Sequence, residues 1–303
     1  MKRLLITGAS GFVGRHCALL AVKQGYDVWA TRSGRSRENA ALDVEGVNWR
    51  TVDLLKPGGL EDVLEEAQPT HVLHTAWVTE HGSYWSSPAN LDWLALGARF
   101  FRRFSELGGQ RFVSAGTCAE YDWSHGYMVE GTTPDAPSTF YGRIKLAHHQ
   151  SLMAAAEGLG FSAASGRIFF AYGPHENSAR LIPSLCTSLL ANSYAEMGSG
   201  MFFRDFMHVD DVASGFLALL ESELTGICNV CSGEPTRLLD IALALGRLNG
   251  RAHLIRPGAR RDRESDPKMV VGSNRKLLST GWEPKVGLDE GLSGAYKWWS
   301  RVL

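Results

Sequence analysis

A tyrosine and a lysine four positions apart, Tyr141 and Lys145, are the first residues whose types and spacing indicate chemistry. On a helix, residues four apart lie on one face, so the phenol and the ammonium would lie together. A phenol needs its pKa lowered by about three units, or ~4 kcal/mol, to exchange protons near pH 7. One cation about 4 Å away supplies roughly that much at an effective dielectric constant of ~20. The pair therefore predicts an acid or base at Tyr141, with its pKa lowered by Lys145.

Three glycines near the start of the chain form a second candidate site. They stand in the segment Thr7-Gly8-Ala9-Ser10-Gly11-Phe12-Val13-Gly14, after an apolar run and before a helical pattern. In such a turn, backbone N–H groups and a helix N-terminus approach a pyrophosphate. The spacing is G-x-x-G-x-x-G, and its place between the first strand and the first helix favours a dinucleotide site over an ordinary turn. We therefore expect cofactor contacts from Gly8, Gly11, Phe12, Val13 and Gly14.

The end of the second expected strand indicates which dinucleotide is bound. An acidic side chain there would accept hydrogen bonds from the adenosine ribose, but the sequence reads Thr31-Arg32-Ser33-Gly34-Arg35. Arg32 and Arg35 suit a 2′-phosphate, with solvated loop charges as the alternative. We expect NADP(H) to be preferred over NAD(H).

The elements that must position these residues follow from short apolar runs that alternate with helical patterns. This alternation predicts βαβ units and a parallel sheet. Strands are expected at residues 3–7, 27–31, 48–52, 71–75, 111–114 and 162–168, with helices beginning near residues 12, 60, 91 and 140. From about residue 172 the pattern loosens into short helices and a few strands. The sequence thus predicts an α/β fold with a smaller second lobe.

Composition limits the classes of function. The 303 residues include 31 Lys plus Arg and 32 Asp plus Glu, which leaves no chain-wide basic surface for nucleic acid. No segment approaches the ~20 apolar residues of a membrane span. Five unevenly spaced cysteines in a chain of this size indicate a reducing, cytoplasmic setting. Six arginines between Arg251 and Arg275 still allow local phosphate recognition.

The glycine loop and the Tyr141–Lys145 pair together resemble the extended short-chain dehydrogenase/reductase family, which acts on nucleotide sugars. Other segments resemble family blocks in the same order: Asp53-Leu54, His74-Thr75-Ala76, and residues 114–121, 167–174 and 204–212. The resemblance implies a Rossmann-like doubly wound parallel sheet in residues 1–170, with a contribution from residues 205–232. A smaller C-terminal substrate-binding lobe would occupy residues 171–303. Further cofactor contacts are implied for Asp53, Leu54, Ala76, Tyr141, Lys145 and Phe169.

The resemblance also implies roles for three residues. Thr117 would hydrogen-bond the substrate oxygen, and Lys145 would hold the nicotinamide ribose. Tyr141 would protonate the alkoxide that develops as hydride reaches a carbonyl carbon. In isolation, a solvated helix face would be the better explanation of the Tyr141–Lys145 pair. With Thr117 in register 24 residues upstream, we favour catalysis.

Substrate contacts are expected from cationic and aromatic side chains. Arg204 and Arg263 are candidates for binding a diphosphate because guanidinium groups match phosphate oxygens, and Arg180 is a third candidate. For each of them an inter-lobe salt bridge or a surface charge is the alternative. The sugar pocket is expected to be lined by Tyr84, Trp85 and Glu120.

The residues after Thr117 limit the reaction. The family's 4,6-dehydratases resemble one another in an Asp-Glu pair at this place, whereas Cys118-Ala119 follows here, so dehydration is not expected. Hydride transfer at one carbon remains, and the whole pattern is most similar to nucleotide-sugar 4-ketoreductases. We expect NADPH-dependent reduction of the C4 keto group of a nucleotide-diphosphate 4-keto-6-deoxy sugar. A 4-epimerase with tightly bound NAD and a non-enzymatic NADP-binding sensor or assembly factor are the alternatives.

Two remaining patterns are not expected to bind a metal. Cys228 and Cys231 have CxxC spacing, but they lie in an expected strand, where residues i and i+3 face opposite sides. His148 and His149 are adjacent on a helix and do not converge on one ion.

The resemblance also implies an oligomeric state. Members of the family commonly form dimers through two helices, which would be residues 91–107 and 140–158 here, so a homodimer is expected.

Overall fold

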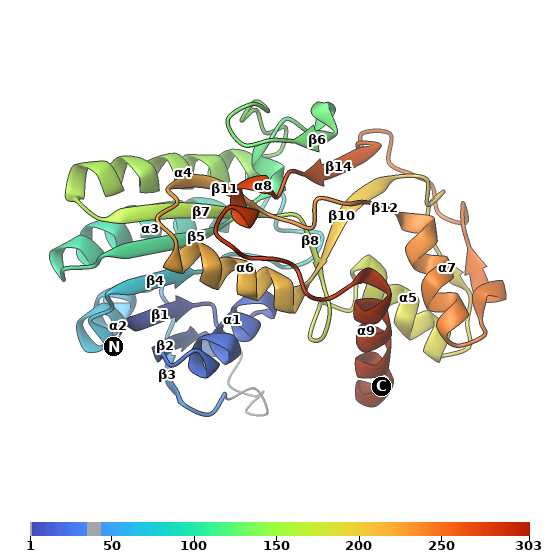
Figure 1. Cartoon of the computed structure of the whole chain (residues 1–303), viewed down its shortest axis with the longest axis horizontal. Helices are drawn as coiled ribbons and strands as arrows, with labels where there is room; N and C mark the ends of the chain where they lie inside the picture. The colour runs from blue at the N-terminus through green and yellow to red at the C-terminus, as the bar shows by residue number, and fades with distance from the viewer. Residues whose placement is uncertain (1, 35–43) are drawn as a thin grey trace.

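A seven-stranded parallel sheet forms the larger lobe of the computed structural model, which describes residues 2–34 and 44–303 (Figure 1). Its strand order is β11-β7-β5-β4-β1-β2-β3, and every neighbouring pair is parallel. The strands are β1 (Arg3–Thr7), β2 (Asp27–Arg32), β3 (Val47–Thr51), β4 (His71–His74), β5 (Arg111–Thr117), β7 (Ser162–Ile168) and β11 (Gly226–Val230). The order runs outward from β1 in both directions, which is the doubly wound arrangement of a Rossmann-like sheet. The fold class expected from the sequence is confirmed.

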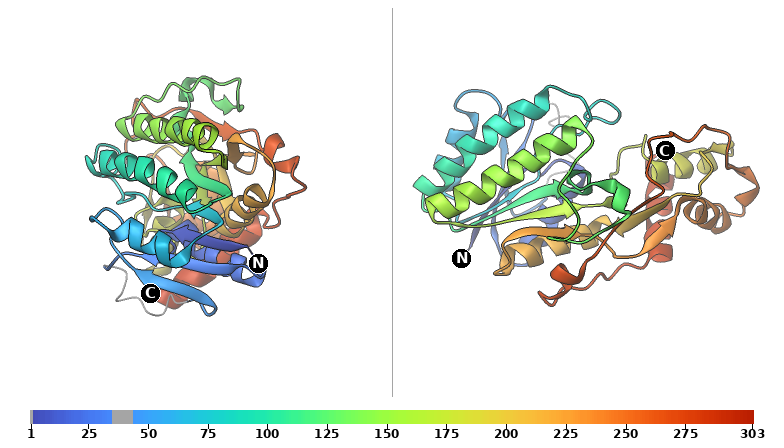
Figure 2. Two further views of the ribbon diagram at one scale, coloured as in Figure 1. Left: turned by 90° about the vertical axis from the view of Figure 1, so that its left-hand side faces the viewer. Right: turned by 90° about the horizontal axis from the view of Figure 1, so that it is seen from above.

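Helices cover both faces of this sheet. One face carries α1 (Phe12–Lys23) and α6 (Val209–Glu221), and the other carries α2 (Gly59–Ala67), α3 (Ala89–Glu106) and α4 (Phe140–Leu159). Figure 2 shows α3 and α4 side by side on one side of the strands. Successive residues of a strand face opposite sides, so Ile6 joins the core beneath α1 and α6 while Leu5 joins the other core. Burial on both faces explains why the strands read as continuous apolar runs.

The smaller lobe combines short strands with three helices and lies on the right in Figure 1. Its main sheet has the order β12-β10-β14-β6, with β8 paired to β10. These strands are β6 (Tyr127–Met128), β8 (Phe170–Tyr172), β10 (Phe203–His208), β12 (Pro235–Arg237) and β14 (Met269–Gly272), and β9 (Ala195–Glu196) pairs with β13 (Ile255–Arg256). Helices α5 (Leu181–Leu190), α7 (Leu238–Leu248) and α9 (Leu288–Val302) enclose a third apolar core.

The chain crosses between the lobes repeatedly. After β10, α6 and β11 return to the larger lobe, and α8 (Arg275–Leu278) packs beside β11. Leu277 and Trp282 then join the same core as α6. The carboxylate of Asp211, in the first turn of α6, accepts the N–H groups of Lys285 and Val286 at 2.9 and 2.8 Å. The lobes are therefore tied together by the late segment that precedes α9.

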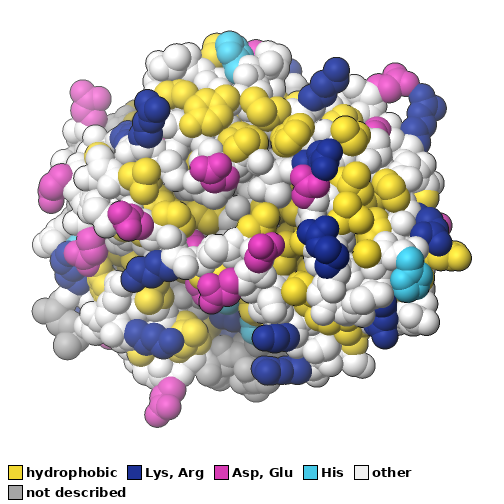
Figure 3. Space-filling model, turned by 45° about the vertical axis from the view of Figure 1, so that its right-hand side comes forward, with side chains coloured by type: hydrophobic (Ala, Val, Ile, Leu, Met, Phe, Trp, Pro, Cys, Tyr) yellow, Lys and Arg dark blue, Asp and Glu magenta, His cyan; other side chains and the backbone are white. Residues whose placement is uncertain are grey.

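The expected strands are present with small changes in their bounds. The largest change is in β5, which continues to Thr117 because its pairing with β7 extends as far as Ile168. Thr117 therefore stands at the carboxyl end of a central strand. In the described part of the chain, no helix is both long and apolar enough to cross a bilayer. On the face shown in Figure 3, acidic side chains are interspersed among the Lys and Arg side chains.

Candidate active site

The glycine loop joins β1 to α1 at the carboxyl edge of the sheet. Gly8 has a φ of +71°, and a Cβ there would lie 2.7 Å from backbone atoms of Ala76. A Cβ on Gly14 would lie 2.5 Å from the Gly8 carbonyl oxygen. Helix α1 follows Gly11 without a side-chain cap and has no acidic residue in the first turn that Phe12 begins. This close-packed turn, with uncapped N–H groups, fits the pyrophosphate of a dinucleotide.

The side chain of Arg32 lies beside the adjacent edge strand at the end of β2. Its Nε donates to Thr51 Oγ1 at 3.0 Å, and its guanidinium carbon lies 5.3 Å from the Trp49 ring centroid. The preceding residue, Thr31, accepts the N–H of Gly8 through its hydroxyl at 3.2 Å. Arg32 is therefore held at the same sheet edge as the glycine loop.

The other residues expected at the cofactor differ in their exposure to solvent. Asp53 is exposed just beyond β3, and its Oδ1 accepts the N–H of Leu55 at 3.1 Å. Leu54 is buried in the core beneath α2, and Ala76 packs directly on Gly8. Arg35 lies outside the described residues.

The turn at residues 117–120, which we term the Thr117 turn, is fixed by a buried carboxylate. The Thr117 hydroxyl accepts the N–H of Ala119 at 3.2 Å, and the Thr117 N–H donates to Glu120 Oε1 at 2.8 Å. Glu120 Oε2 accepts a hydrogen bond from Arg167 Nε at 2.9 Å, and both side chains are fully buried. From the sequence we expected Glu120 to line the sugar pocket; in the structure its carboxylate is occupied by Thr117 and Arg167. Glu120 therefore positions Thr117.

Tyr141 reaches Thr117 because α4 begins against the Thr117 turn. Thr139 caps α4 by accepting the N–H of Gly142 at 3.0 Å. A Cβ on Gly142 would collide with the Ala119 carbonyl oxygen, so glycine permits this close approach. The Thr117 side chain lies close enough to the Tyr141 phenol to act on its pKa. Two hydroxyl groups therefore lie together at the carboxyl edge of the sheet.

The environment of Tyr141 raises the pKa of its phenol. Burial is the largest cause and Tyr84 and Glu120 add to it, while the Thr117 side chain acts in the opposite direction. The sequence predicted a pKa lowered by Lys145, and the structure gives the opposite direction. A raised pKa keeps the phenol protonated at neutral pH, which suits a proton donor.

Lys145, one turn further along α4, is buried without a carboxylate partner. Its Nζ donates to the Ala115 carbonyl at 2.6 Å and lies 3.9 Å from the centroid of the Trp77 ring. Across the described residues, Lys145 forms no ion pair. Burial lowers the pKa of this ammonium to about 8, and Glu120 offsets part of the effect. Burial, and not the charge of Lys145, sets the direction of the pKa shift of Tyr141.

Aromatic side chains surround the Tyr141 ring. Tyr84 and Trp85 stack with their centroids 4.6 Å apart, and each meets Tyr141 edge to face, at 4.9 and 5.6 Å. The Tyr141 N–H donates to the Trp85 carbonyl at 3.1 Å. The Arg180 guanidinium lies 5.9 Å from the centroid of the Tyr84 ring, and its charge acts to lower the pKa of the Tyr84 hydroxyl against the larger effect of burial. Tyr84 and Trp85 therefore pack directly on the Tyr141 ring, and Arg180 lies next to Tyr84.

The three arginines expected at a diphosphate differ in their surroundings. Arg180 and Arg263 both contribute to lowering the pKa of His81, after burial as the largest cause. Arg204 is only 5% exposed, and its guanidinium donates to Asp266 Oδ1 at 2.7 Å and to two backbone carbonyls. Arg204 therefore anchors the segment around Asp266, whereas the charges of Arg180 and Arg263 both act at His81.

Phe169 and the cysteines pack in the interior. Phe169, expected at the cofactor, is buried in a cluster with Cys118, Tyr121 and Cys231. Burial raises the pKa of the Cys118 thiol to about 12. All five cysteines are buried and free. Among the residues that the structure describes, no three His, Cys, Asp or Glu side chains are grouped to hold a metal ion.

Three residues that shape the site were not singled out from the sequence. Gly142 is required by its contact with Ala119, and Trp77 covers Lys145. Asn90 is fully buried, and its Oδ1 accepts the indole N–H of Trp77 at 2.7 Å. The one signal in the sequence for any of them was that Trp77 directly follows Ala76, a residue already expected at the cofactor.

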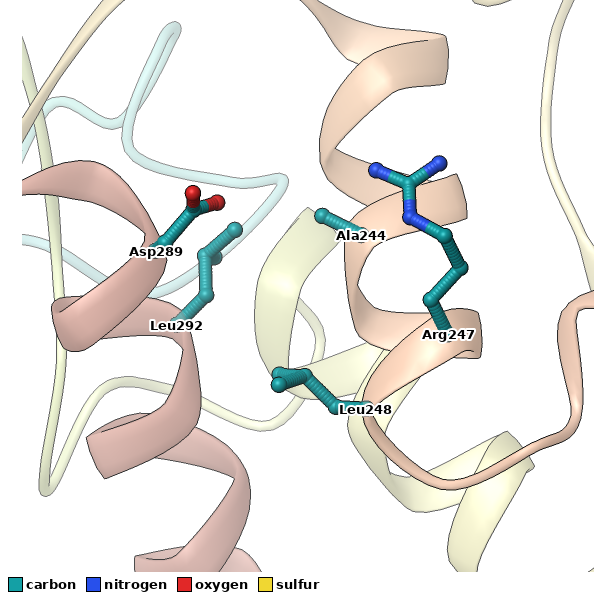
Figure 4. A pocket seen from close by; sticks show the side chains of 5 residues that line it. All are labelled: Ala244, Arg247, Leu248, Asp289 and Leu292. Carbon is teal, nitrogen blue, oxygen red and sulfur yellow. The ribbon is translucent and has the colours of Figure 1, made fainter.

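A separate pocket lies between α7 and α9 of the smaller lobe. Figure 4 shows Arg247 and Leu248 on one helix and Asp289 and Leu292 on the other. Its volume is about 340 Å³, and Ala244 completes its lining. It shares no residue with the site around Tyr141.

Comparison of the sequence with models of known protein families relates this site to known proteins. The model of the NAD dependent epimerase/dehydratase family matches residues 4–231, well over half of the chain. The chain belongs to this family. The residues that match the family model include the glycine loop, Thr117, Tyr141 and Lys145. The family resemblance drawn from the sequence is therefore confirmed.

Individual members of the epimerase/dehydratase family match along nearly the whole chain. GDP-6-deoxy-D-mannose reductase of Pseudomonas aeruginosa is 29% identical to this chain. The alignment covers 99% of this chain and 98% of the reductase. UDP-glucose 4-epimerase of Rhizobium meliloti is 26% identical, with the same two coverages. The solved structure of Thermus thermophilus UDP-glucose 4-epimerase in complex with NAD superposes with a TM-score of 0.88 at 25% identity, covering 99% of this chain and 100% of that one.

Proposed function

We propose that this chain is an NADPH-dependent reductase of the C4 keto group of a nucleotide-diphosphate 4-keto-6-deoxy sugar. The observation that carries the proposal is the close approach of α4 to the Thr117 turn, which places Tyr141 beside Thr117 with its phenol kept protonated by burial. A protonated phenol beside a second hydroxyl can polarise a carbonyl and then protonate the resulting alkoxide. Similarity to GDP-6-deoxy-D-mannose reductase supports the substrate class.

Each residue of the pair has a defined task in this reduction. The Thr117 hydroxyl orients the carbonyl oxygen, and Tyr141 transfers its proton to that oxygen as the carbonyl carbon is reduced. Lys145, a buried cation on the same helix, stabilises the phenolate left on Tyr141. Glu120 holds the Thr117 turn in place. The glycine loop would hold the pyrophosphate of the dinucleotide, whose nicotinamide would supply the hydride when bound.

The Thr117 turn does not favour elimination of water. Dehydration needs an additional group that removes a proton from a sugar carbon. The Cys118 thiol stays protonated because burial raises its pKa to about 12. The Glu120 carboxylate already accepts hydrogen bonds from Thr117 and Arg167. These side chains support hydride and proton transfer at a single carbonyl group.

Recognition of the nucleotide sugar is assigned to the cations and aromatic rings around Tyr141. We infer that Arg180 and Arg263 bind the diphosphate and that Tyr84 packs on the sugar. Replacing Arg180 by Met should raise KM about 10- to 100-fold and leave kcat within a few-fold, because charge-assisted hydrogen bonds contribute about 1.5–3 kcal/mol. Arg102→Met, at another exposed arginine, on α3, is the matched control. Equal KM values for the two variants would exclude Arg180 from diphosphate binding.

The preference for NADPH is assigned to the end of β2. Arg32 stands where an acidic residue would select the unphosphorylated ribose, and its guanidinium suits a 2′-phosphate. Arg32→Ser should weaken NADPH binding about tenfold or more and leave NADH binding unchanged, as measured by nicotinamide fluorescence. If the purified protein prefers NADH or carries NAD, this assignment is wrong.

The decisive experiment is a panel of 4-keto-6-deoxy sugar nucleotides, followed by NADPH absorbance and product NMR. Tyr141→Phe should reduce turnover about 10²–10⁴-fold while NADPH binding persists, because only the transferred proton is removed. Tyr127→Phe, at an exposed tyrosine in the smaller lobe, is the control and should retain activity. Unchanged turnover in Tyr141→Phe would refute the catalytic assignment. Absence of turnover with every substrate would favour a cofactor-binding sensor or assembly factor.

A nucleotide-sugar 4-epimerase with tightly bound NAD is the second candidate. Its support is the similarity to UDP-glucose 4-epimerases over nearly the full chain, including one solved in complex with NAD. An epimerase interconverts two alcohols without net consumption of the dinucleotide. Product NMR on UDP-glucose, without added cofactor, therefore separates this candidate from the reductase.

A further inference from the structure

We propose that Trp77 is a positioning residue for Lys145, with the indole face holding the buried ammonium and Asn90 fixing the indole. The expected effect on turnover rests on the proposed function. The contact between the two side chains belongs to the free chain and is testable without any reaction.

The ammonium of Lys145 has few polar partners for a buried cation. It carries three N–H donors, yet its one hydrogen-bond acceptor among the described residues is the Ala115 carbonyl, at 2.6 Å. Its Nζ lies 3.9 Å from the centroid of the Trp77 ring, and Lys145 is 4% exposed. An aromatic face attracts a cation most strongly where water is excluded. The indole therefore supplies the second stabilising contact.

The other titratable groups around Lys145 provide little compensating charge. From the Thr117 turn, the negative Glu120 raises the pKa of the lysine, but both oxygens of this carboxylate are already hydrogen-bonded. His74 of β4 and His148 of α4 face the ammonium and are neutral, because burial and the lysine charge lower their pKa values. On its own helix, Tyr141 is also neutral, since its pKa is raised.

Asn90 fixes the indole and links it to the segment over Tyr141. The Trp77 Nε1–H donates to Asn90 Oδ1 at 2.7 Å. The amide of Asn90 donates in turn to the carbonyls of Tyr84 and Ser87, at 2.8 and 2.9 Å. Between these two residues lies Trp85, whose carbonyl accepts the N–H of Tyr141. One buried amide thus connects the ring that holds Lys145 to the segment that packs on Tyr141.

The direct test is an NMR titration of the Lys145 ammonium in ligand-free protein with ¹³Cε-labelled lysine. The chain has eight lysines, and Lys145→Met identifies the resonance. Trp77→Leu should lower the pKa of Lys145 by about one unit, which corresponds to ~1.4 kcal/mol. Leucine is chosen because its apolar bulk keeps the ammonium desolvated, so the change removes the ring face alone. Trp77→Phe keeps a smaller ring and should lower the pKa by less.

Trp93→Leu is the matched control. Trp93 stacks on Trp77 with centroids 6.0 Å apart, and among the described residues the ring over the Lys145 ammonium is that of Trp77, not Trp93. Its loss should affect stability and leave the Lys145 titration unchanged. An unchanged pKa in Trp77→Leu, or an increase, would overturn the proposal, because either result shows that the ring does not stabilise the charge.

Turnover supplies the second measurement. If the protonated lysine supports reduction, kcat/KM should fall at a lower pH on the alkaline side of its pH profile in Trp77→Leu, by about one pH unit. In Trp93→Leu the profile should not change. An NMR shift in a protein that reduces no 4-keto sugar nucleotide would refute the proposed function and leave the positioning role intact. Reduction that persists with an unmoved Lys145 titration would refute the positioning role alone.

Discussion

Two buried cations lie near the Thr117 turn, and each lies over an aromatic ring. Arg167, on β7, has its guanidinium carbon 4.0 Å from the centroid of Tyr121. Lys145, on α4, has its Nζ 3.9 Å from the centroid of Trp77. Their polar partners differ completely. Arg167 donates to two carboxylates, at 2.9 and 2.6 Å, whereas Lys145 donates to one backbone carbonyl at 2.6 Å.

The difference in partners separates a structural cation from a reactive one. Burial acts to lower the pKa of Arg167, but the attraction of Glu120 and Asp135 outweighs it and raises the pKa. Burial of Lys145 is only partly offset, so its pKa falls to about 8. A paired guanidinium keeps its charge at any physiological pH and fixes the fold around it. An unpaired ammonium can gain or lose its proton close to neutrality, which suits a group that supports proton transfer.

The largest expected effect is the loss of stability on Arg167→Met. This change leaves the fully buried Glu120 and the partly exposed Asp135 without their cation. The free energy of unfolding should fall by about 3–5 kcal/mol, the usual result of breaking a buried ion pair from one side. Urea denaturation followed by circular dichroism measures it. A loss below ~1 kcal/mol would show that Arg167 is as dispensable to the fold as Lys145.

Lys145→Met should give the opposite pattern. Because the ammonium forms no ion pair with a carboxylate of the described residues, its removal leaves no buried charge without a partner. Stability should therefore change by less than about 1 kcal/mol or increase. Turnover should nevertheless fall about 10²–10³-fold, since the phenolate left on Tyr141 loses its stabilising charge. Parallel denaturation and NADPH-consumption assays give both quantities. Large destabilisation with moderate loss of turnover would remove the distinction between the two cations.

A smaller, pH-dependent effect is expected at His74, a neutral neighbour of Lys145. Burial and the Lys145 charge lower its pKa from 6.5 to about 3, so between these values the unfolded state binds a proton that the folded state does not. The histidine therefore costs stability as the pH falls below about 6.5. In His74→Asn, the slope of unfolding free energy against pH from 6 to 4 should decrease by up to ~1.4 kcal/mol per unit. The amide can still reach Thr7, the present partner of His74. An identical slope in both proteins would mean that His74 is protonated in the fold.

Tyr121→Phe should have the smallest effect. The ring beneath Arg167 remains, and the change removes only the hydroxyl that donates to Asn229 Oδ1 at 2.9 Å. Stability should fall by about 1–2 kcal/mol, because a buried acceptor is left unpaired. Turnover should not change. A drop in turnover would mean that the paired cation is coupled to the reaction after all.

The backbone framework could be predicted because it depends on local patterns. The strand at residues 162–168 has the expected bounds, and helix α4 begins at the expected residue. The burial of Arg167 inside that strand could not be predicted, because its charge is neutralised by Glu120 and Asp135 from distant segments. A charged residue in a central strand gives no local sign of the partners that allow it.

The site could be predicted in part for the same reason. Motifs identified Thr117, Tyr141 and Lys145, but spacing on a helix says nothing about where a long side chain points. The ammonium contacts Ala115 of β5 and Trp77, which follows β4, and both come from segments far away in the sequence. The pKa of Tyr141 depends on burial beneath residues far away in the sequence. Chemistry-bearing residues were therefore visible in the sequence, whereas their environments required the fold.

The late return of the chain to the larger lobe has a consequence for its synthesis on the ribosome. The edge strand β11 and the cover supplied by α6 come after the first strands of the smaller lobe, and Leu277 and Trp282 complete the same core. A nascent chain that has released β1 to β7 exposes one side of α1 and an unpaired strand edge. This half-covered sheet persists until nearly the whole polypeptide has left the exit tunnel. The period of greatest risk for aggregation therefore falls in the second half of translation, and chaperones that bind open strand edges would act on this chain before its last helix is made.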